Sequence, residues 1–470
     1  MSHTRVFATA PPSFRAAWSI ISFVALVATW NLAAATDRAD RPNIIVILTD
    51  DHGYADVGFH ACQDIPTPYL DVLAKGGVIC SQGYVTCPVC SPSRAGLLTG
   101  RYQQRLGFDD NSWSTKTGLA VEAKTIADFL KDAGYSTMAI GKWHLGQLPQ
   151  FRPLVRGFSD HYGFLGGGRS FLPLSESQGV AFVPKDPDQV DLWRNEQRVE
   201  DPPYLTDALG DEAVSYIERH KTNPFFIYLA FNAPHVPLQA TDKYLQRFPD
   251  LKGARRTYAA MISAVDDAVG RLTETLRREN MDDRTLIFFL SDNGGHPIAS
   301  GAQNRPLKRE KGTVYEGGIR VPFVVKWTGR IPAGRTFSHP VISLDIAATA
   351  LAAAGITPDI PLDGIDLVPH LSEKMNKPPH ETLYWRFVDQ RAIRHGKWKL
   401  TTPRGEPEGL YDLSTDISES NDVSAANPEI VANLRTIYAK WEAQLPPARV
   451  TAPRQKKAAT PAAPTAVKGN

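Results

Sequence analysis

The sequence predicts an α/β protein with a large central, mostly parallel sheet sandwiched by helices, and a smaller C-terminal α+β subdomain carrying an antiparallel sheet. Continuous apolar runs recur along the first two thirds of the chain, as expected of strands buried on both faces of a parallel sheet. Helical patterns lie between these runs, and such alternation favours a sheet layered by helices. After about Pro378 the pattern changes to short strands near turns.

The main domain is expected to span residues 41–377. Its buried strands are predicted at 44–48, 136–140, 225–231 and 286–290. Its helices are predicted at 125–133, 205–220, 255–279 and 343–354. The third of these helices carries one stripe of apolar residues at helical spacing, namely Met261, Val265, Val269, Leu272 and Leu276. Gly134 and Gly355 suit the ends of the first and last.

The C-terminal subdomain is expected to span residues 378–445. Short strands are predicted at 382–387, 390–394 and 397–401, and a helix at 428–443 closes the fold. The remaining tail, 446–470, consists largely of Ala, Pro, Thr and Lys and has few core-forming residues. We therefore expect this tail to be disordered.

The N-terminus resembles an export signal, which we place at residues 1–35. Arg5 and Arg15 precede an apolar run from Trp18 to Trp30, and Ala33–Ala35 supplies small residues for cleavage. The alternative is a membrane anchor, but the run is shorter than the about 20 apolar residues that a span needs. We expect an exported protein, periplasmic or secreted, with no stable membrane insertion after cleavage.

The bulk composition excludes few partners. The 470 residues are 42% apolar and 22% charged, and the formal net charge is +2. Basic residues form no blocks outside the tail, so no nucleic-acid partner is expected.

All four cysteines, Cys62, Cys80, Cys87 and Cys90, lie in one short stretch. Export would permit two disulfides. If Cys90 has a chemical role, the other three allow one bridge and one free thiol, and the sequence leaves their pairing open.

Polar side chains follow each of the four predicted strands. They occur in the segments Asp50–Asp51, Gly141–Lys142–Trp143–His144, Asn232–Ala233–Pro234–His235 and Ser291–Asp292–Asn293–Gly294–Gly295. In open α/β sheets ligands bind beyond the carboxyl ends of the strands. If the strands are parallel neighbours, these groups converge on one site.

The oxygen ligands in this set suit a hard cation. Asp50, Asp51, Asp292 and Asn293 favour Ca²⁺ or Mg²⁺ over Zn²⁺. A divalent ion would also supply the counter-charge that adjacent aspartates need. The alternative is that Asp50–Asp51 caps the next segment and Asp292–Asn293–Gly294 is only a turn. The pairing of the two segments at matched strand ends favours the metal.

Cys90 precedes a short predicted helix. Ser91 fits its N-cap, Pro92 its first position and Gly100 its end. Cys90 would then lie at a helix N-terminus, where an anion is favoured, and Arg94 could reach the same group. A buried structural cysteine and a thiol nucleophile of lowered pKa are the alternatives.

These motifs together resemble a known family. Cys90-x-Pro92-x-Arg94, followed by Leu98–Thr99–Gly100–Arg101, resembles the signature of the type I, formylglycine-dependent sulfatases of the alkaline phosphatase superfamily. Further segments resemble the family's motifs in the family's order: Thr49–Asp50–Asp51 with Gly53, Gly141–Lys142–Trp143–His144–Leu145–Gly146, Ser291–Asp292–Asn293–Gly294, and Lys311–Gly312–Thr313 with Tyr315–Glu316–Gly317–Gly318. The matches span Pro42 to about Pro322.

The resemblance implies an arylsulfatase-type enzyme that cleaves sulfate esters. Cys90 would be oxidised to formylglycine (3-oxoalanine) by a formylglycine-generating enzyme. One calcium ion would be held by Asp50, Asp51, Asp292, Asn293 and the modified Cys90. Catalytic roles would fall to Arg94, which holds the formylglycine, to Lys142 and Lys311, which bind sulfate, to His144, which processes the formylglycine hydrate, and to His235, which lies near the leaving oxygen.

Analogy with exported bacterial members suggests a sulfated carbohydrate as substrate. Seven residues are candidates for a sugar pocket, although most of them also fit packing or surface roles: Tyr162, Arg169, Phe171, Trp193, Arg194, Trp385 and Arg386. Three other functions remain open, namely a phosphate or phosphonate monoester hydrolase of the same fold, a silent glycan-binding homologue and a thiol hydrolase that uses Cys90.

Overall fold

The computed structural model describes residues 1–6, 41–111, 117–176, 186–375 and 377–447. The apolar run and cleavage site of the predicted signal lie outside these residues, and so does the predicted tail after residue 447. No helix within the described part of the chain is long and apolar enough to cross a membrane.

The main domain is built on a ten-stranded sheet. In spatial order its strands are β11 (Arg335–Phe337), β2 (Val78–Cys80), β10 (Phe323–Lys326), β9 (Thr285–Ser291), β1 (Asn43–Thr49), β8 (Phe225–Ala230), β4 (Ser136–Lys142), β5 (Asp160–Phe164), β6 (Leu192–Arg194) and β7 (Gln197–Val199). The five strands from β9 to β5 are parallel. Antiparallel pairing occurs only toward the two edges of the sheet.

All four predicted buried strands are confirmed as β1, β4, β8 and β9, and they are adjacent in the sheet. The other six strands of the sheet were not predicted from the sequence. Most of these have only three or four residues, and β5 contains Asp160, His161 and Gly163, so none shows a long apolar run.

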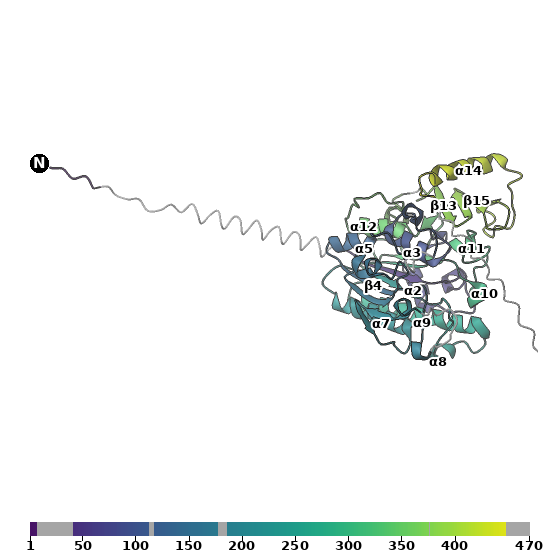
Figure 1. The fold of residues 1–470 in the computed structure, drawn as a ribbon, viewed down its shortest axis with the longest axis horizontal. Coiled ribbons are helices and arrows are strands. Elements are labelled where there is room, and N and C mark those ends of the chain that lie inside the picture. The colour runs from purple at the N-terminus through teal and green to yellow at the C-terminus, as the bar shows by residue number, and fades with distance from the viewer. Residues whose placement is uncertain (7–40, 112–116, 177–185, 376, 448–470) are drawn as a thin grey trace, which may run out of the picture.

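Helices cover both faces of the sheet (Figure 1). On one face lie α2 (Pro68–Lys75), α7 (Leu205–Arg219), α8 (Asp242–Leu245) and α9 (Gly253–Arg278), packed on the side that carries Ile45 and Ile47. On the other face lie α3 (Cys90–Thr99), α5 (Ile126–Asp132) and α12 (Asp345–Ala353), packed on the side of Ile44 and Val46. Because successive side chains of β1 point to opposite faces, its unbroken apolar run serves both layers.

The four predicted main-domain helices are confirmed within about two residues, as α5, α7, α9 and α12. Helix α5 begins with a capping box. The Thr125 hydroxyl accepts a hydrogen bond from the Asp128 N–H, and the Asp128 carboxylate accepts from the Thr125 N–H at 2.8 Å. These bonds satisfy N–H groups that have no partner within the helix.

Replacing Thr125 by alanine removes this cap and is expected to lower the free energy of unfolding by about 1–2 kcal/mol. Urea unfolding followed by circular dichroism measures the loss. Thr436→Ala is the control, because the Thr436 hydroxyl donates to Ala432 O inside helix α14 (Pro428–Glu442) and caps nothing. Equal losses in the two variants would contradict the capping role.

The C-terminal subdomain contains the four-stranded antiparallel sheet β13 (Thr382–Phe387), β14 (Gln390–His395), β15 (Trp398–Thr402) and β16 (Gly409–Asp412), with helix α14 (Pro428–Glu442) against it. This confirms the predicted α+β subdomain and adds β16. Its apolar side chains share one core with main-domain residues that include Tyr84, Val314 and Ile319. The subdomain lies at one end of the molecule (Figure 1).

The four cysteines are all free, so the disulfides that export would permit are not formed. Cys80, Cys87 and Cys90 are buried and Cys62 is partly buried. The closeness of the four cysteines in sequence therefore does not lead to disulfide bonds.

Candidate active site

The site lies where four neighbouring parallel strands end. Leu48 of β1 is paired with Leu290 of β9 and with Ala230 of β8, and Ala230 is paired with Gly141 of β4. The polar residues that follow these positions therefore leave the same edge of the sheet. The convergence expected from the sequence is present in the structure.

Asp50 and Asp51 form the centre of the cluster. Asp50 is anchored through its N–H to Ala233 O at 3.1 Å, and Asp51 through its N–H to Asp292 Oδ1 at 3.3 Å. Asp51 has a φ of 62°, a left-handed conformation that is uncommon for residues other than glycine. The chain thus turns sharply after β1 and both carboxylates point into the site, which rules out a capping role for them.

Cys90 is the first residue of α3 and is almost completely buried. Its Sγ lies 3.4 Å from Asp50 Oδ1 and 3.4 Å from Lys311 Nζ. The helix begins two residues earlier than predicted, with Val89 instead of Ser91 as N-cap. Ser91 does not cap it, because its hydroxyl donates to His144 O at 2.5 Å. The predicted end at Gly100 is confirmed by its φ of 64°.

Three cations face three carboxylates in the cluster. Arg94 donates to Asp292 Oδ2 at 2.9 Å through Nε and to Lys142 O at 2.9 Å. Lys142 forms an ion pair with Asp50, and Lys311 contacts both oxygens of Asp51 at 2.6 and 2.8 Å. All of these groups are buried or nearly so, and removing one partner of a pair would leave a buried charge unpaired, which is costly.

Two histidines lie beside these charges. His235 Nε2 is 3.7 Å from Asp51 Oδ2, and its Nδ1 lies 2.6 Å from Val236 O. With side chains 17% and 13% exposed, His235 and Lys311 are the members of the cluster nearest to solvent. His144 has a φ of 57° and its ring lies against Gly167, where a Cβ would come within 2.6 Å of Nε2.

The neighbouring charges and burial shift the pKa values of the three carboxyl groups in different directions, down for Asp50 and Asp51 and up for Asp292. Burial alone would raise the pKa of Asp50, but Lys142 and nearby cations hold it well below its usual range. Burial also opposes ionisation of Asp51, yet Lys311 keeps its pKa low. Burial and the charge of Asp50 raise the pKa of Asp292 to about 7. A further positive charge would therefore be best accommodated near Asp292.

The Cys90 thiol and the two histidines of the cluster are largely neutral at neutral pH. Burial, reinforced by Asp50, raises the pKa of the Cys90 thiol to about 12. This disfavours the thiol-hydrolase alternative, because an effective thiol nucleophile needs a lowered pKa. Burial and neighbouring cations lower the pKa of both His144 and His235.

The donor set fits a hard divalent cation. Ligand atoms of Asp50, Asp51, Cys90 and His235 all lie within 4.8 Å of one another. The side-chain oxygen of Asn293 is buried and has no hydrogen-bond partner within the described residues, while its Nδ2 donates to Asp51 Oδ1 at 2.7 Å. Carboxylate and amide oxygens are the ligands that Ca²⁺ and Mg²⁺ prefer. An unpaired buried oxygen among carboxylates is what a bound cation would satisfy.

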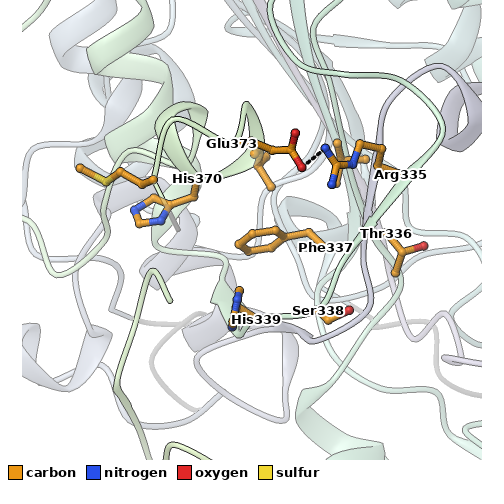
Figure 2. Close-up of a pocket in the computed structure, with 10 residues that line it drawn as sticks. Arg335, Thr336, Phe337, Ser338, His339, His370 and Glu373 are labelled. Carbon is orange, nitrogen blue, oxygen red and sulfur yellow. Dashed lines mark ion pairs between the residues drawn. The ribbon is translucent and has the colours of Figure 1, made fainter. Parts of the chain in front are cut away.

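The candidate sugar-pocket residues are mostly structural. Trp385 donates from Nε1 to Val85 O, Arg386 pairs with Asp109 and Arg169 pairs with Asp201. Among the described residues, five cavities contain no member of the cluster, and Trp193 is the sugar-pocket candidate that lines one of these five. One of about 250 Å³ lies beside β11, where Arg335 and Glu373 form an ion pair (Figure 2), and it contains none of the predicted site residues.

Comparison with known proteins assigns this α/β fold and its polar cluster to the hydrolases of the alkaline phosphatase superfamily. The sulfatase family model matches residues 42–356. A second model, the C-terminal part of N-sulphoglucosamine sulphohydrolase, matches residues 309–444.

Individual relatives agree with these matches. Human arylsulfatase A is 32% identical over 484 residues, covering 90% of this chain and 92% of the relative. Human N-acetylgalactosamine-6-sulfatase is 34% identical over 391 residues, which cover 78% of this chain and 72% of the relative. The crystal structure of Ps i-CgsB in complex with k-i-k-neocarrahexaose is 40% identical, with a TM-score of 0.81, and covers 87% of this chain and 94% of that one. The chain belongs to the sulfatase family and is a sulfuric ester hydrolase.

Proposed function

We propose that this enzyme removes sulfate from a sulfated carbohydrate through a formylglycine formed from Cys90, with one calcium ion in the site. The observation that carries the proposal is the buried cluster itself, in which Cys90 lies against Asp50 and Lys311. A phosphate or phosphonate esterase is the alternative within the superfamily. No feature of the cluster favours it over sulfate.

The cation would be held by Asp50, Asp51, Asp292 and Asn293, together with the group at position 90. It supplies positive charge that polarises sulfate and the attacking group. Lys142 and Lys311 are each paired with one of these aspartates in this structure. With a cation balancing the aspartates, Lys142 and Lys311 would be free to bind sulfate oxygens through their ammonium groups, and preorganised charge of this kind is usually the largest catalytic contribution.

Formylglycine, in its hydrated form, supplies a hydroxyl to attack sulfur and a second hydroxyl that allows sulfate to leave. Arg94 orients the residue at position 90 from one helical turn away. His144, neutral because its pKa is lowered, is suited to accept a proton. His235 and Lys311 are the most accessible groups of the cluster, and we assign to this pair the proton that the departing alcohol needs.

The substrate class rests on the relatives. One is named for N-acetylgalactosamine 6-sulfate and another was crystallised with a neocarrahexaose. Both compounds are carbohydrates, and the protein crystallised with the second is 40% identical in sequence to this chain. We therefore propose a sulfated oligosaccharide, met after export to the periplasm or the medium.

The test is hydrolysis by the full chain produced together with a formylglycine-generating enzyme. We expect release of inorganic sulfate from neocarrageenan oligosaccharides, and a kcat/KM for 4-nitrophenyl sulfate at least about 100-fold above that for 4-nitrophenyl phosphate. A preference for the phosphate would overturn the assignment. Cleavage of the aryl sulfate but of no sulfated sugar would retain the reaction and reject the substrate class.

A further inference from the structure

The segment that carries Lys311 is held only in part by its own domain, for example where Asn304 Nδ2 donates to Arg309 O at 3.3 Å. It runs from Lys308 to the start of α11 (Glu316–Ile319). Lys311 N–H donates to Gly295 O at 3.2 Å, and Gly312 N–H donates to Pro88 O at 2.8 Å. A lysine has a long, flexible side chain, so the place of its Nζ depends on how firmly the backbone beneath it is held.

The C-terminal subdomain supplies that support next to Lys311. Gln390, the first residue of β14, is 2% exposed. Its Nε2 donates to Gly312 O at 2.8 Å, and its Oε1 accepts from Val314 N–H at 3.4 Å. One amide thus binds the backbone on both sides of Thr313. Val314 in turn packs in the core that the subdomain shares with the main domain.

A buried charge cluster fixes the C-terminal end of the same segment. Lys399 of β15 is completely buried and pairs with Glu316 at 2.9 Å and with Glu419 at 2.8 Å. Glu419 Oε2 also accepts the Glu316 N–H at 2.7 Å. Removing one member of such a cluster would leave a buried charge unpaired, which is costly. Because the cluster is therefore hard to break, it fixes Glu316 at the beginning of α11.

The other end of the segment is held by the same subdomain. Lys308 donates to Glu419 O at 2.9 Å, and its ammonium group lies 4.3 Å from the ring centre of Tyr315 and 5.1 Å from that of Tyr411. These contacts combine a hydrogen bond with cation–π attraction. Both ends and the middle of the Lys311 segment are therefore fixed by residues of the C-terminal subdomain.

We propose that the C-terminal subdomain is a positioning element of the active site, and that Gln390 acts through the Gly312 backbone to place the Lys311 ammonium group. This inference rests on the proposed role of Lys311 toward sulfate. Gln390 touches no reacting atom and is a positioning residue. A displacement of about 1 Å in a catalytic group can cost up to about 100-fold in rate.

The test compares Gln390→Met with Gln104→Met. Gln104 is also fully buried, and its Nε2 donates at 2.8 Å to Arg386 O across the same boundary between domain and subdomain. We expect Gln390→Met to lower kcat/KM for a sulfate ester about 10-fold and Gln104→Met to change it less than about 2-fold. Equal losses would assign the effect to attachment of the subdomain in general and overturn the proposal.

A double-mutant cycle then asks whether the loss passes through Lys311. In a Lys311→Ala background Gln390→Met should have almost no further effect, because the group that it positions is gone. An undiminished 10-fold loss in that background would overturn the proposal.

Hydrogen exchange of the peptide 308–316 tests the positioning without any activity. Gln390→Met should speed exchange of the Val314 amide, and Gln104→Met should not. Unchanged exchange in Gln390→Met would reject the positioning role whatever the enzyme hydrolyses. A wild-type chain inactive on every sulfate ester, with exchange altered as expected, would reject the proposed function alone.

Discussion

Replacing Cys90 by alanine is expected to lower kcat for sulfate ester hydrolysis by on the order of 10⁴-fold or more, because the variant cannot form the proposed nucleophile. The fold should survive. Cys90 is buried, but alanine removes only one sulfur atom and leaves a small cavity, so we expect less than about 2 kcal/mol of lost stability. Steady-state hydrolysis of 4-nitrophenyl sulfate and a thermal melt measure the two effects.

Cys87→Ala is the matched control. Cys87 is also fully buried and three residues away, yet within the described residues its thiol makes no hydrogen bond to an aspartate like that between Cys90 and Asp50. This variant should keep most of its activity. A well-folded Cys90→Ala protein with wild-type activity would refute the mechanism, since no other residue of the cluster can supply the same chemistry.

The peptide Gly76–Arg94 gives an independent readout of the same hypothesis. Tryptic cleavage after Lys75 and Arg94 releases it, with Cys80, Cys87 and Cys90 inside. Conversion to formylglycine replaces a sulfur and two hydrogens by one oxygen. That mass change at Cys90, and not at the other two cysteines, is expected after co-production with a formylglycine-generating enzyme.

The layout of the site was predictable because it depends on strand ends. The apolar runs of β1, β4, β8 and β9 are visible in the sequence, and parallel neighbours bring the residues after them to one edge. The sequence alone therefore groups Asp50, Lys142, His235 and Asp292 at one site. The family motifs added Lys311, which follows no predicted strand.

Other features could not be read from local patterns. Ser91 has the sequence of an N-cap, yet its hydroxyl bonds to His144 O, a partner 53 residues away. Gln390 shows no motif, because its function depends on backbone groups of Gly312 and Val314 far along the chain. Long-range contacts of this kind are set by how the subdomain packs, and a single sequence carries no periodic signal for them.

Replacing Asp292 by asparagine is expected to weaken calcium binding about 10-fold or more and to lower kcat by about 10²–10³-fold together with it. The variant keeps an oxygen for Arg94 but removes one of the three carboxylate charges that the cation would balance. Burial and Asp50 already raise the pKa of Asp292 to about 7, so a nearby cation is what favours its ionised form. Loss of the charge should therefore weaken calcium binding more than it lowers the stability of the fold.

Thermal stability measures calcium binding independently of catalytic turnover. Calcium at 100 times its dissociation constant should stabilise the wild-type chain by about 2.7 kcal/mol, and each tenfold loss of affinity removes about 1.4 kcal/mol of that at the same concentration. Asp109→Asn is the control, because Asp109 forms a similarly buried pair with Arg386 outside the cluster. It should lower the melting temperature equally with and without calcium, whereas Asp292→Asn should lose about half or more of the calcium-dependent stabilisation. If Asp292→Asn keeps the full calcium shift, Asp292 is not a ligand.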